Sequence, residues 1–219
     1  MEVTLIDWMG SDNTVADSAR VSFDKEASNY SDEQNEKLIH YLAKHNHWSP
    51  FSHCFLQFRV KAPIFIARQL QKHTVGLAWN EISRRYVDFE PEFYVPETWR
   101  SRPEGSVKQG SGGNIEDGIV KYGFESIHLP TDYEEYIRMC ADQYYFLLSV
   151  NVAPEQARMV LPQSMYTEWY WSGSLYAFAR ICNQRLGEGA QKEAGIIAQE
   201  ISEHCEELFP VSWKALTNY

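Results

Sequence analysis

Alternating apolar and polar residues just before a proline constrain the fold of this sequence more than any other feature. In the stretch "HCFLQFRVKAP", residues 53–63, Leu56, Phe58 and Val60 alternate with three polar side chains. This period of two is that of a strand with one buried face. Pro63 fits the first turn of a helix, which continues as "IFIARQLQKH". We therefore expect a half-buried strand that runs directly into a helix.

Other strand and helix patterns are unevenly distributed along the chain. Residues 3–8, "VTLIDW", suit an opening strand, and a helix is expected at about residues 32–45, where Ser31 and Gln34 form a capping box. The second half has mostly helical patterns, with one helix over "GSLYAFARICNQR" and a long one over about residues 190–208. Strands gathered early and helices dominating late predict an α+β fold.

The chain of 219 residues is long enough for one sizeable core, and we expect a single domain over residues 1–219. The stretch "RSRPEGSVKQGSGG", at about residues 100–114, is rich in Gly, Ser and charge and has almost no large apolar residues. Because apolar sequence continues on both sides, this stretch indicates a mobile surface loop rather than a linker between domains.

The net charge of −10 argues against binding to a nucleic acid polymer, because neutralising many phosphates needs an excess of Lys and Arg. A few local arginines can still hold one small anion. The four cysteines form no CxxC pair, which fits buried free thiols in a reducing compartment. With no secretory signal and no run of the roughly 18–20 apolar residues that span a membrane, we expect a cytoplasmic protein with no membrane partner.

Polar and basic residues are concentrated in "LQKHTVGLAWNEISRRYV", residues 70–87. Two further arginines, Arg158 and Arg185, lie beside apolar residues rather than in charged runs. For either one alone, a structural ion pair is the simpler interpretation. Together with Arg84 and Arg85 they indicate a site for a small anion, because guanidinium groups suit phosphate and carbonyl oxygens.

Two other kinds of site receive less support. His45, His47 and His53 in "HNHWSPFSH" have no Cys or carboxylate at ligand spacing within that run, so local hydrogen bonds are a better explanation than a metal. Ser83 lacks a GxSxG context for a nucleophile, and the chain has no Walker A or GxGxxG loop. The residues alone therefore predict a pocket for a small, anionic, planar ligand, lined by Arg, His and aromatic groups.

Four stretches together resemble a known family. They are "VKAPIFIARQ", "NEISRRY", "ARMVLPQSMYTEWYWSGSL" and "NQRLGEGAQKE". In this order they resemble the flavin-dependent thymidylate synthases, whose signature is Arg-His-Arg, a short spacer and Asn-Glu-x-Ser-x-Arg-Tyr. The resemblance covers nearly the whole chain except the stretch at 100–114. It implies a mixed or antiparallel sheet followed by a mostly helical C-terminal half.

The first part of the signature differs in this chain. Lys72, His73 and Thr74 stand in place of Arg-His-Arg, and the spacer "VGLAW" is one residue longer. Lys replaces Arg as a point charge but not as a planar fork, and Thr carries no charge. Ser174 and Tyr176 likewise stand where some members have Asn and Arg near the flavin.

The resemblance implies reductive methylation of dUMP to dTMP. The carbon donor would be 5,10-methylenetetrahydrofolate, and the hydride source would be FADH2, which NADPH regenerates. Members of the family are homotetramers, and their active sites draw residues from several subunits. The chemistry then belongs to the cofactor, so no activated cysteine is required.

The resemblance also implies roles for individual residues. Those expected to bind dUMP are Gln69, Glu81, Ser83, Arg84, Arg85, Arg158 and Arg185. Those expected to face FAD are His47, Ser49, Lys72, His73, Thr74, Glu81, Ser174 and Arg180. Arg185 would be the catalytic residue, because a fixed cation over the uracil stabilises negative charge that develops on the ring carbonyl.

Two alternatives stay open beside this synthase. Lys72 and Thr74 are compatible with a regulator that binds nucleotide or flavin on the same fold without catalysis. The histidines of "HNHWSPFSH" are compatible with a metalloenzyme, which would contain stoichiometric metal and lose activity with a chelator.

Overall fold

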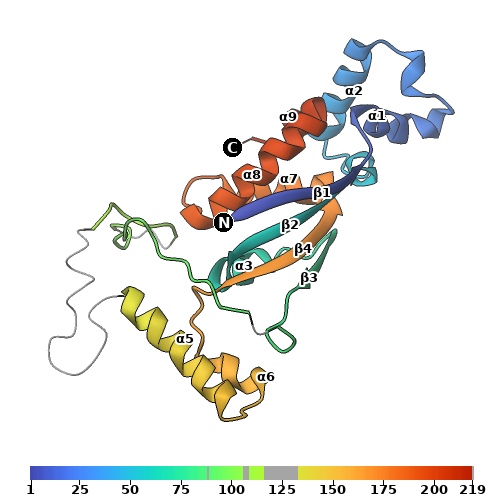
Figure 1. The fold of residues 1–219 in the computed structure, drawn as a ribbon. Coiled ribbons are helices and arrows are strands. Elements are labelled where there is room, and N and C mark those ends of the chain that lie inside the picture. The colour runs from blue at the N-terminus through green and yellow to red at the C-terminus, as the bar shows by residue number, and fades with distance from the viewer. Residues whose placement is uncertain (88, 106–108, 116–132, 219) are drawn as a thin grey trace. The chain divides into compact units, whose positions relative to one another are not determined.

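A computed structural model describes residues 1–87, 89–105, 109–115 and 133–218 of the chain (Figure 1). Its strands are β1 (Glu2–Met9), β2 (Phe55–Pro63), β3 (Leu77–Glu81) and β4 (Tyr166–Ser174). Its α-helices are α1 (Asp12–Arg20), α2 (Asp32–Lys44), α3 (Ile64–Leu70), α5 (Tyr133–Ser149), α6 (Pro154–Ala157), α7 (Leu175–Arg185), α8 (Lys192–Leu208) and α9 (Pro210–Leu216). Short 3₁₀ helices are η1 (Val21–Phe23), η2 (Ala27–Asn29), η3 (Pro50–His53) and η4 (Arg158–Val160). The predicted α+β class is confirmed.

Within the described residues the strands form a four-stranded sheet in the order β1-β2-β4-β3. β1 and β2 are antiparallel, with Val3 opposite Val60 and an irregularity between Leu5 and Asp7. The other neighbouring strands are antiparallel too, because the residue numbers of their hydrogen-bonded pairs rise on one strand as they fall on the other. For β2 and β4 these pairs are Gln57 with Ser172 and Ile64 with Met165. For β3 and β4 they are Gly76 with Ser174 and Ile82 with Glu168. The predicted mixed or antiparallel sheet is therefore antiparallel.

Backbone contacts group the chain into two compact units. The first unit comprises Met1–Lys61, Leu70–Asn80 and Trp169–Tyr219, and the second comprises Ala62–Gln69 and Glu81–Glu168. The single domain over residues 1–219 stays a prediction.

The core of the first unit forms where helices cover one face of the sheet. Leu56, Phe58 and Val60 of β2 are buried, as their alternation with polar residues predicts. Phe178 of α7 packs edge-on against Phe58, with ring centroids 5.0 Å apart, and against Trp171 of β4 at 5.5 Å. α8 packs on α7 and runs beside β1 (Figure 1). Aromatic burial of this kind is the main stabilising term in such a core.

Helix α2 begins at the predicted capping box. The Ser31 hydroxyl accepts a hydrogen bond from the Gln34 backbone N–H, and the Gln34 side chain accepts one from the Ser31 backbone N–H. Two donors that the helix leaves unpaired at its start are thereby satisfied. At its other end, Asn46 adopts a left-handed conformation with φ 56° and turns the chain toward His47 and Trp48.

Two strands that the sequence interpretation did not include complete the sheet. β4 carries buried Thr167, Trp169 and Trp171 at alternate positions. In the sequence it lies between η4 and α7, within the half that was expected to be mostly helical. β3 follows the turn after α3. The signal for β4 was present, since Thr, Tyr and Trp favour strands and alternate here with more exposed residues.

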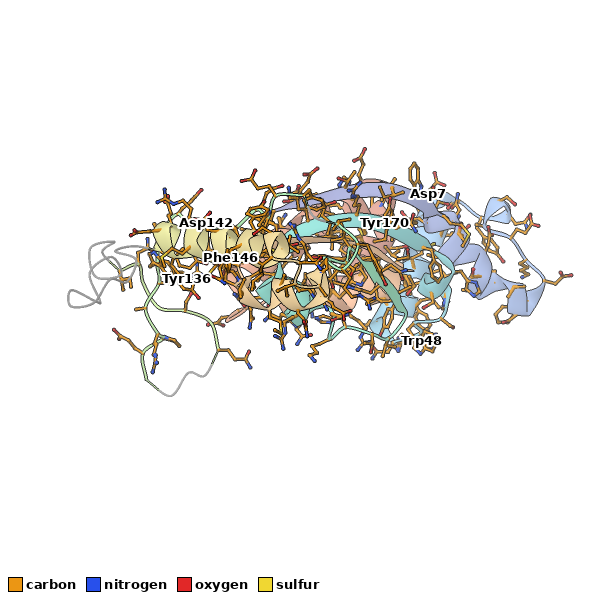
Figure 2. The ribbon with its side chains drawn as sticks, turned by 60° about the horizontal axis from the view of Figure 1, so that its bottom comes forward. Asp7, Trp48, Tyr136, Asp142, Phe146 and Tyr170 are labelled. Atoms are coloured by element: carbon orange, nitrogen blue, oxygen red, sulfur yellow. The ribbon has the colours of Figure 1, made fainter. Side chains whose placement is uncertain are left out.

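The second unit contains α5, α6 and η4, which pack on one another. α5 buries Ile137 and Tyr144 and exposes other apolar side chains, among them Phe146, which is labelled in Figure 2. The stretch at about 100–114 is paired at both ends, because Arg100 forms a bridge with Asn114. Residues 106–108 of that stretch lie outside the described residues, so its mobility stays a prediction.

All four cysteines are free thiols, as predicted. Cys54, Cys182 and Cys205 are buried, whereas Cys140 is partly accessible. Burial raises the pKa of Cys54 to about 11. Across the described parts of the chain, no helix is both long and apolar enough to cross a membrane.

Candidate functional site

The turn between α3 and β3 brings His73 against the end of α7. The His73 N–H donates to the Leu70 carbonyl oxygen at 3.0 Å, and the Leu77 N–H donates to that of Thr74 at 3.3 Å. Gly76 has φ +76°, and a Cβ there would lie 3.3 Å from the Ala177 side chain. The turn therefore packs closely on the first residues of α7 and requires the left-handed backbone that glycine adopts readily.

Arg185, the last residue of α7, contacts His73 through two nitrogens. Its Nε donates to His73 Nε2 at 3.1 Å, and its Nη2 lies 3.0 Å from the same atom. Burial, followed by the positive charges of Arg185 and Arg180, lowers the pKa of His73 from 6.5 to about 4. The imidazole is consequently neutral near pH 7 and accepts hydrogen bonds through Nε2. The flanking Lys72 and Thr74 are exposed.

A cavity of about 270 Å³ lies in the first unit between the end of α2, α7 and the last residues of the chain. It is lined by Leu42, Ala43, Asn46, His47, Trp48, Phe51, Tyr176, Ala179, Arg180, Asn183, Ala215, Leu216, Thr217 and Asn218. Two of these, His47 and Arg180, were predicted to face FAD. Ser49 directly follows the lining residue Trp48, and Ser174 caps α7 by accepting a hydrogen bond from the Ala177 N–H at 3.2 Å.

Aromatic and amide side chains add to this cavity beyond the predicted residues. Trp48, which is 55% exposed and labelled in Figure 2, lies with its ring centroid 6.2 Å from that of Tyr176. The Asn183 amide binds the C-terminal segment by donating to the Leu216 carbonyl at 2.8 Å and accepting from the Asn218 N–H at 3.0 Å. The resemblance had already placed Tyr176 near the flavin, whereas for Trp48 the signal was the general abundance of aromatic residues.

In the second unit, Glu81 is held at the end of β3. Thr167, which is 5% exposed, donates its hydroxyl proton to Glu81 Oε1 at 2.7 Å. The neighbouring Ser83 hydroxyl accepts from the Arg85 N–H at 3.3 Å and lies 3.5 Å from its Nε. Arg85 is exposed and lies 4.9 Å over the Tyr86 ring. This loop therefore presents a carboxylate, a hydroxyl and a guanidinium within a few residues.

Arg84 differs from Arg85 in its surroundings. It is 7% exposed, and its guanidinium donates to the backbone carbonyls of Phe89 and Glu90 and lies 4.4 Å over the Phe89 ring. Its donors are thus largely used within the loop. Its predicted contact with dUMP stays a prediction.

Gln69 and Arg158 are the other predicted nucleotide ligands in the second unit. The Gln69 Oε1 atom is buried and has no hydrogen-bond partner among the described residues. A buried acceptor of this kind is rare unless a ligand or water satisfies it. Arg158 is exposed and donates from Nε to the Glu155 carbonyl at 3.3 Å.

The predicted residues divide between the two units. His47, Ser49, Lys72, His73, Thr74, Ser174, Arg180 and Arg185 belong to the first unit, and Gln69, Glu81, Ser83, Arg84, Arg85 and Arg158 belong to the second. The histidines of "HNHWSPFSH" pack locally, with the His45 ring 4.3 Å from that of Tyr41. Among the described residues, no group of three or more His, Cys, Asp or Glu could hold a metal ion.

Known proteins match this chain over most of its length. The family model described as thymidylate synthase complementing protein matches residues 4–211. A flavin-dependent thymidylate synthase from Kosmotoga olearia is 36% identical over 217 residues, which cover 99% of this chain and 90% of that relative. The chain belongs to the flavin-dependent thymidylate synthase family. Another such synthase, from Thermus thermophilus, is 37% identical over 217 residues, covering 99% of this chain and 76% of that relative.

Solved structures agree with membership of the flavin-dependent thymidylate synthase family. The UMP/dUMP methylase PolB from Streptomyces cacaoi, bound with 5-Br dUMP, matches with a TM-score of 0.83 and 29% identity, over 98% of this chain and 93% of that one. A second structure of that enzyme, bound with 5-Br UMP, matches with a TM-score of 0.82 and 28% identity, over 98% and 92%. The resemblance predicted from the four sequence stretches is confirmed.

Proposed function

We propose that this protein catalyses the methylation of dUMP to dTMP as a flavin-dependent thymidylate synthase. The observation that carries the proposal is the match to this family across residues 4–211, which includes the whole of "NEISRRY". The solved PolB structure with 5-Br dUMP supports a uracil nucleotide as the substrate. The regulator without catalysis is not favoured, because relatives that match 99% of the chain are named as synthases.

The cavity of the first unit fits part of a flavin nucleotide. Trp48 and Tyr176 offer aromatic surface for a planar ring, and Arg180 offers a cation for a pyrophosphate oxygen. We propose that His47, Ser49, Ser174 and Arg180 help to hold FAD here. When bound and reduced, the flavin supplies the hydride of the reaction, with NADPH as its reductant and 5,10-methylenetetrahydrofolate as the carbon donor.

The second unit carries side chains that suit dUMP, on the loop after β3, on α3 and on η4. Arg85 and Arg158 are exposed guanidinium groups suited to the phosphate, and the Ser83 hydroxyl lies beside Arg85. The buried Gln69 Oε1 needs a donor, which an N–H or O–H group of the nucleotide would provide. Thr167 fixes one oxygen of Glu81, so this carboxylate is oriented before any ligand binds.

Arg185 is the proposed catalytic residue. The uracil ring must become a carbon nucleophile before it bonds to the incoming carbon, and negative charge develops on a ring carbonyl oxygen as that nucleophile forms. A fixed guanidinium near that oxygen lowers the energy of this charge and requires little reorganisation in a site from which water is excluded. Arg185 suits this role because it is half-buried and already held by His73.

We also propose a homotetramer in the cytoplasm. Exposed apolar residues on α5, such as Met139 at 49%, Phe146 at 57% and Val150 at the end of the helix at 54%, support burial against another subunit. The free cysteines support a reducing compartment. Light scattering on purified protein measures the mass and separates a tetramer from a monomer.

Release of tritium from 5-tritiated dUMP tests the proposed activity. Purified protein receives FAD, NADPH and 5,10-methylenetetrahydrofolate under anaerobic conditions, with one reagent omitted in each control. Steady release that needs every reagent supports the synthase. Tight binding of FAD and dUMP without release would favour the regulator. Loss of activity with a chelator and stoichiometric metal would favour the metalloenzyme.

A further inference from the structure

We propose that His73 is a positioning residue that orients the guanidinium of Arg185 through its Nε2 atom. The family signature places His73 among the flavin-facing residues, whereas in this structure its Nε2 is used by Arg185. The inference rests on the proposed role of Arg185 at the uracil ring and assigns a second residue to that role.

The geometry fixes the direction of the hydrogen bonds. Arg185 Nε and Nη2 lie on one edge of the planar guanidinium and converge on one atom at 3.1 and 3.0 Å. A guanidinium nitrogen can only donate, so His73 Nε2 must be the acceptor and the ring proton lies on Nδ1. Nη1 of Arg185 has no hydrogen-bond partner in the part of the chain that the structure describes, so the other edge of Arg185 is available to a ligand.

The surroundings of His73 keep it in the accepting form. Arg185 and Arg180 of α7 both oppose protonation, and burial acts in the same direction, so the pKa of His73 falls to about 4. Lys72 is the neighbouring cation on the turn itself and is exposed. A protonated ring would have no acceptor at Nε2 and would repel the guanidinium, so its neutrality is required for the contact.

Holding Arg185 in place matters because its side chain has many rotamers. Fixing a long, flexible side chain costs conformational entropy, which is otherwise lost when the substrate binds. The turn carrying His73 packs on α7 through Gly76 and Ala177, so donor and acceptor are mounted on contacting elements. A misplaced catalytic group reduces the rate by up to about 10²-fold.

A double-mutant cycle tests the coupling between the two residues. The variants are His73→Ala, Arg185→Ala and the combination, with His73→Gln as the conservative change that retains an acceptor. We expect His73→Ala to lower kcat on the order of 10–10²-fold and to weaken dUMP binding, with the double variant no worse than Arg185→Ala. His73→Gln should recover most of the loss, and FAD affinity should stay unchanged in all variants.

The opposite pattern would overturn the proposal. Losses that multiply in the double variant, or weaker FAD binding by His73→Ala and not by Arg185→Ala, would mean that His73 acts on the flavin independently. Far-ultraviolet circular dichroism and melting temperature check that each variant folds. If His73→Ala does not fold, His73→Gln decides: kcat and FAD affinity close to the wild-type values support the positioning role, and weaker FAD binding overturns it.

A measurement without turnover separates this proposal from the proposed function. In protein labelled with ¹⁵N-histidine, the His73 signals should report a neutral ring protonated at Nδ1, and Arg185→Ala should raise the pKa of His73. An Nε2-protonated ring in the wild type, or a pKa that Arg185→Ala leaves unchanged, would overturn the positioning role. Absence of tritium release with the expected spectra would instead count against the proposed function alone.

Discussion

Arg84 and Arg85 are adjacent in the sequence but meet different surroundings. The guanidinium of Arg84 is nearly buried and satisfies two backbone carbonyls, while that of Arg85 is exposed beside the Ser83 hydroxyl. We expect Arg84→Ala to lower the free energy of unfolding by roughly 1–3 kcal/mol, because it removes two hydrogen bonds from a charged donor and the packing of a buried side chain on the Phe89 ring. Arg85→Ala should leave stability nearly unchanged.

The effects of the two substitutions on dUMP binding should be the reverse of their effects on stability. Loss of a charge-assisted hydrogen bond to phosphate removes roughly 1.5–3 kcal/mol, so Arg85→Ala should weaken dUMP binding by about 10-fold to 10²-fold. Urea unfolding measures the stability and calorimetry the affinity of both variants. A destabilised Arg85→Ala that binds dUMP normally would reverse the assignment.

Arg185 and Lys72 are a second pair of cations to compare, because Arg185 is hydrogen-bonded to His73 and Lys72 is exposed. We expect Arg185→Ala to leave FAD bound and to reduce turnover on the order of 10²–10³-fold, as for other groups that stabilise developing charge. Lys72 is exposed and stands where the family has an arginine fork, so Lys72→Ala should reduce turnover much less. Steady-state kinetics with the flavin absorbance as a binding control measures both. Comparable losses would show that the assignment of roles is wrong.

His73 also makes a pH-dependent contribution to stability. Between pH 6.5 and about 4, its ring is protonated in the unfolded chain but neutral in the folded protein. The unfolded state then binds more protons, so stability falls as the pH falls through this window. Urea unfolding at about pH 7 and about pH 5 should therefore show a larger loss for the wild type than for His73→Gln, which cannot titrate. Equal losses would mean that burial and Arg185 do not depress the pKa.

At the scale of the elements, sequence periodicity and capping patterns predicted those features that depend on neighbouring residues alone. The alternation at Leu56, Phe58 and Val60 gave the buried face of β2, and the Ser31 capping box gave the start of α2. β3 was missed because a five-residue strand with one exposed face carries too short a pattern. β4 was missed because its strand-favouring residues run straight into the helical pattern of α7, with Ser174 serving both elements.

The cavity between α2, α7 and the C-terminal residues leads to a prediction at this scale. Trp48→Ala removes an exposed ring from the cavity, so FAD binding should weaken about 2- to 10-fold, as expected for the loss of one aromatic contact. Stability should hardly change. Trp8→Ala is the matched control, because Trp8 of β1 is also about half exposed, at 50%, and does not line the cavity. Quenching of flavin fluorescence measures both affinities, and equal effects would remove Trp48 from the site.

At the scale of the whole molecule, the sequence identified the family and the residue types of the site but not their pairing. His73 and Arg185 were assigned to different ligands, yet 112 positions apart they form one hydrogen-bonded pair. Nothing in the sequence indicates Thr167 as a site residue, although its hydroxyl binds Glu81 across 86 positions. Such contacts depend on α7 packing against the turn after α3 and on β4 pairing with β3. Both are contacts between segments far apart in the sequence, which local periodicity does not predict.

Ligand linkage distinguishes the flavin enzyme from the metalloenzyme in the intact molecule. A ligand that binds only the folded protein raises the free energy of unfolding by about 2.7 kcal/mol at 100 times its Kd. FAD should therefore raise the melting temperature of the wild type, and at one fixed concentration it should raise that of Trp48→Ala less. EDTA should change neither, because no cluster of potential metal ligands occurs in the described residues. A fall in melting temperature with EDTA, restored by added metal, would mean that a metal stabilises the fold and that the flavin is not its only cofactor.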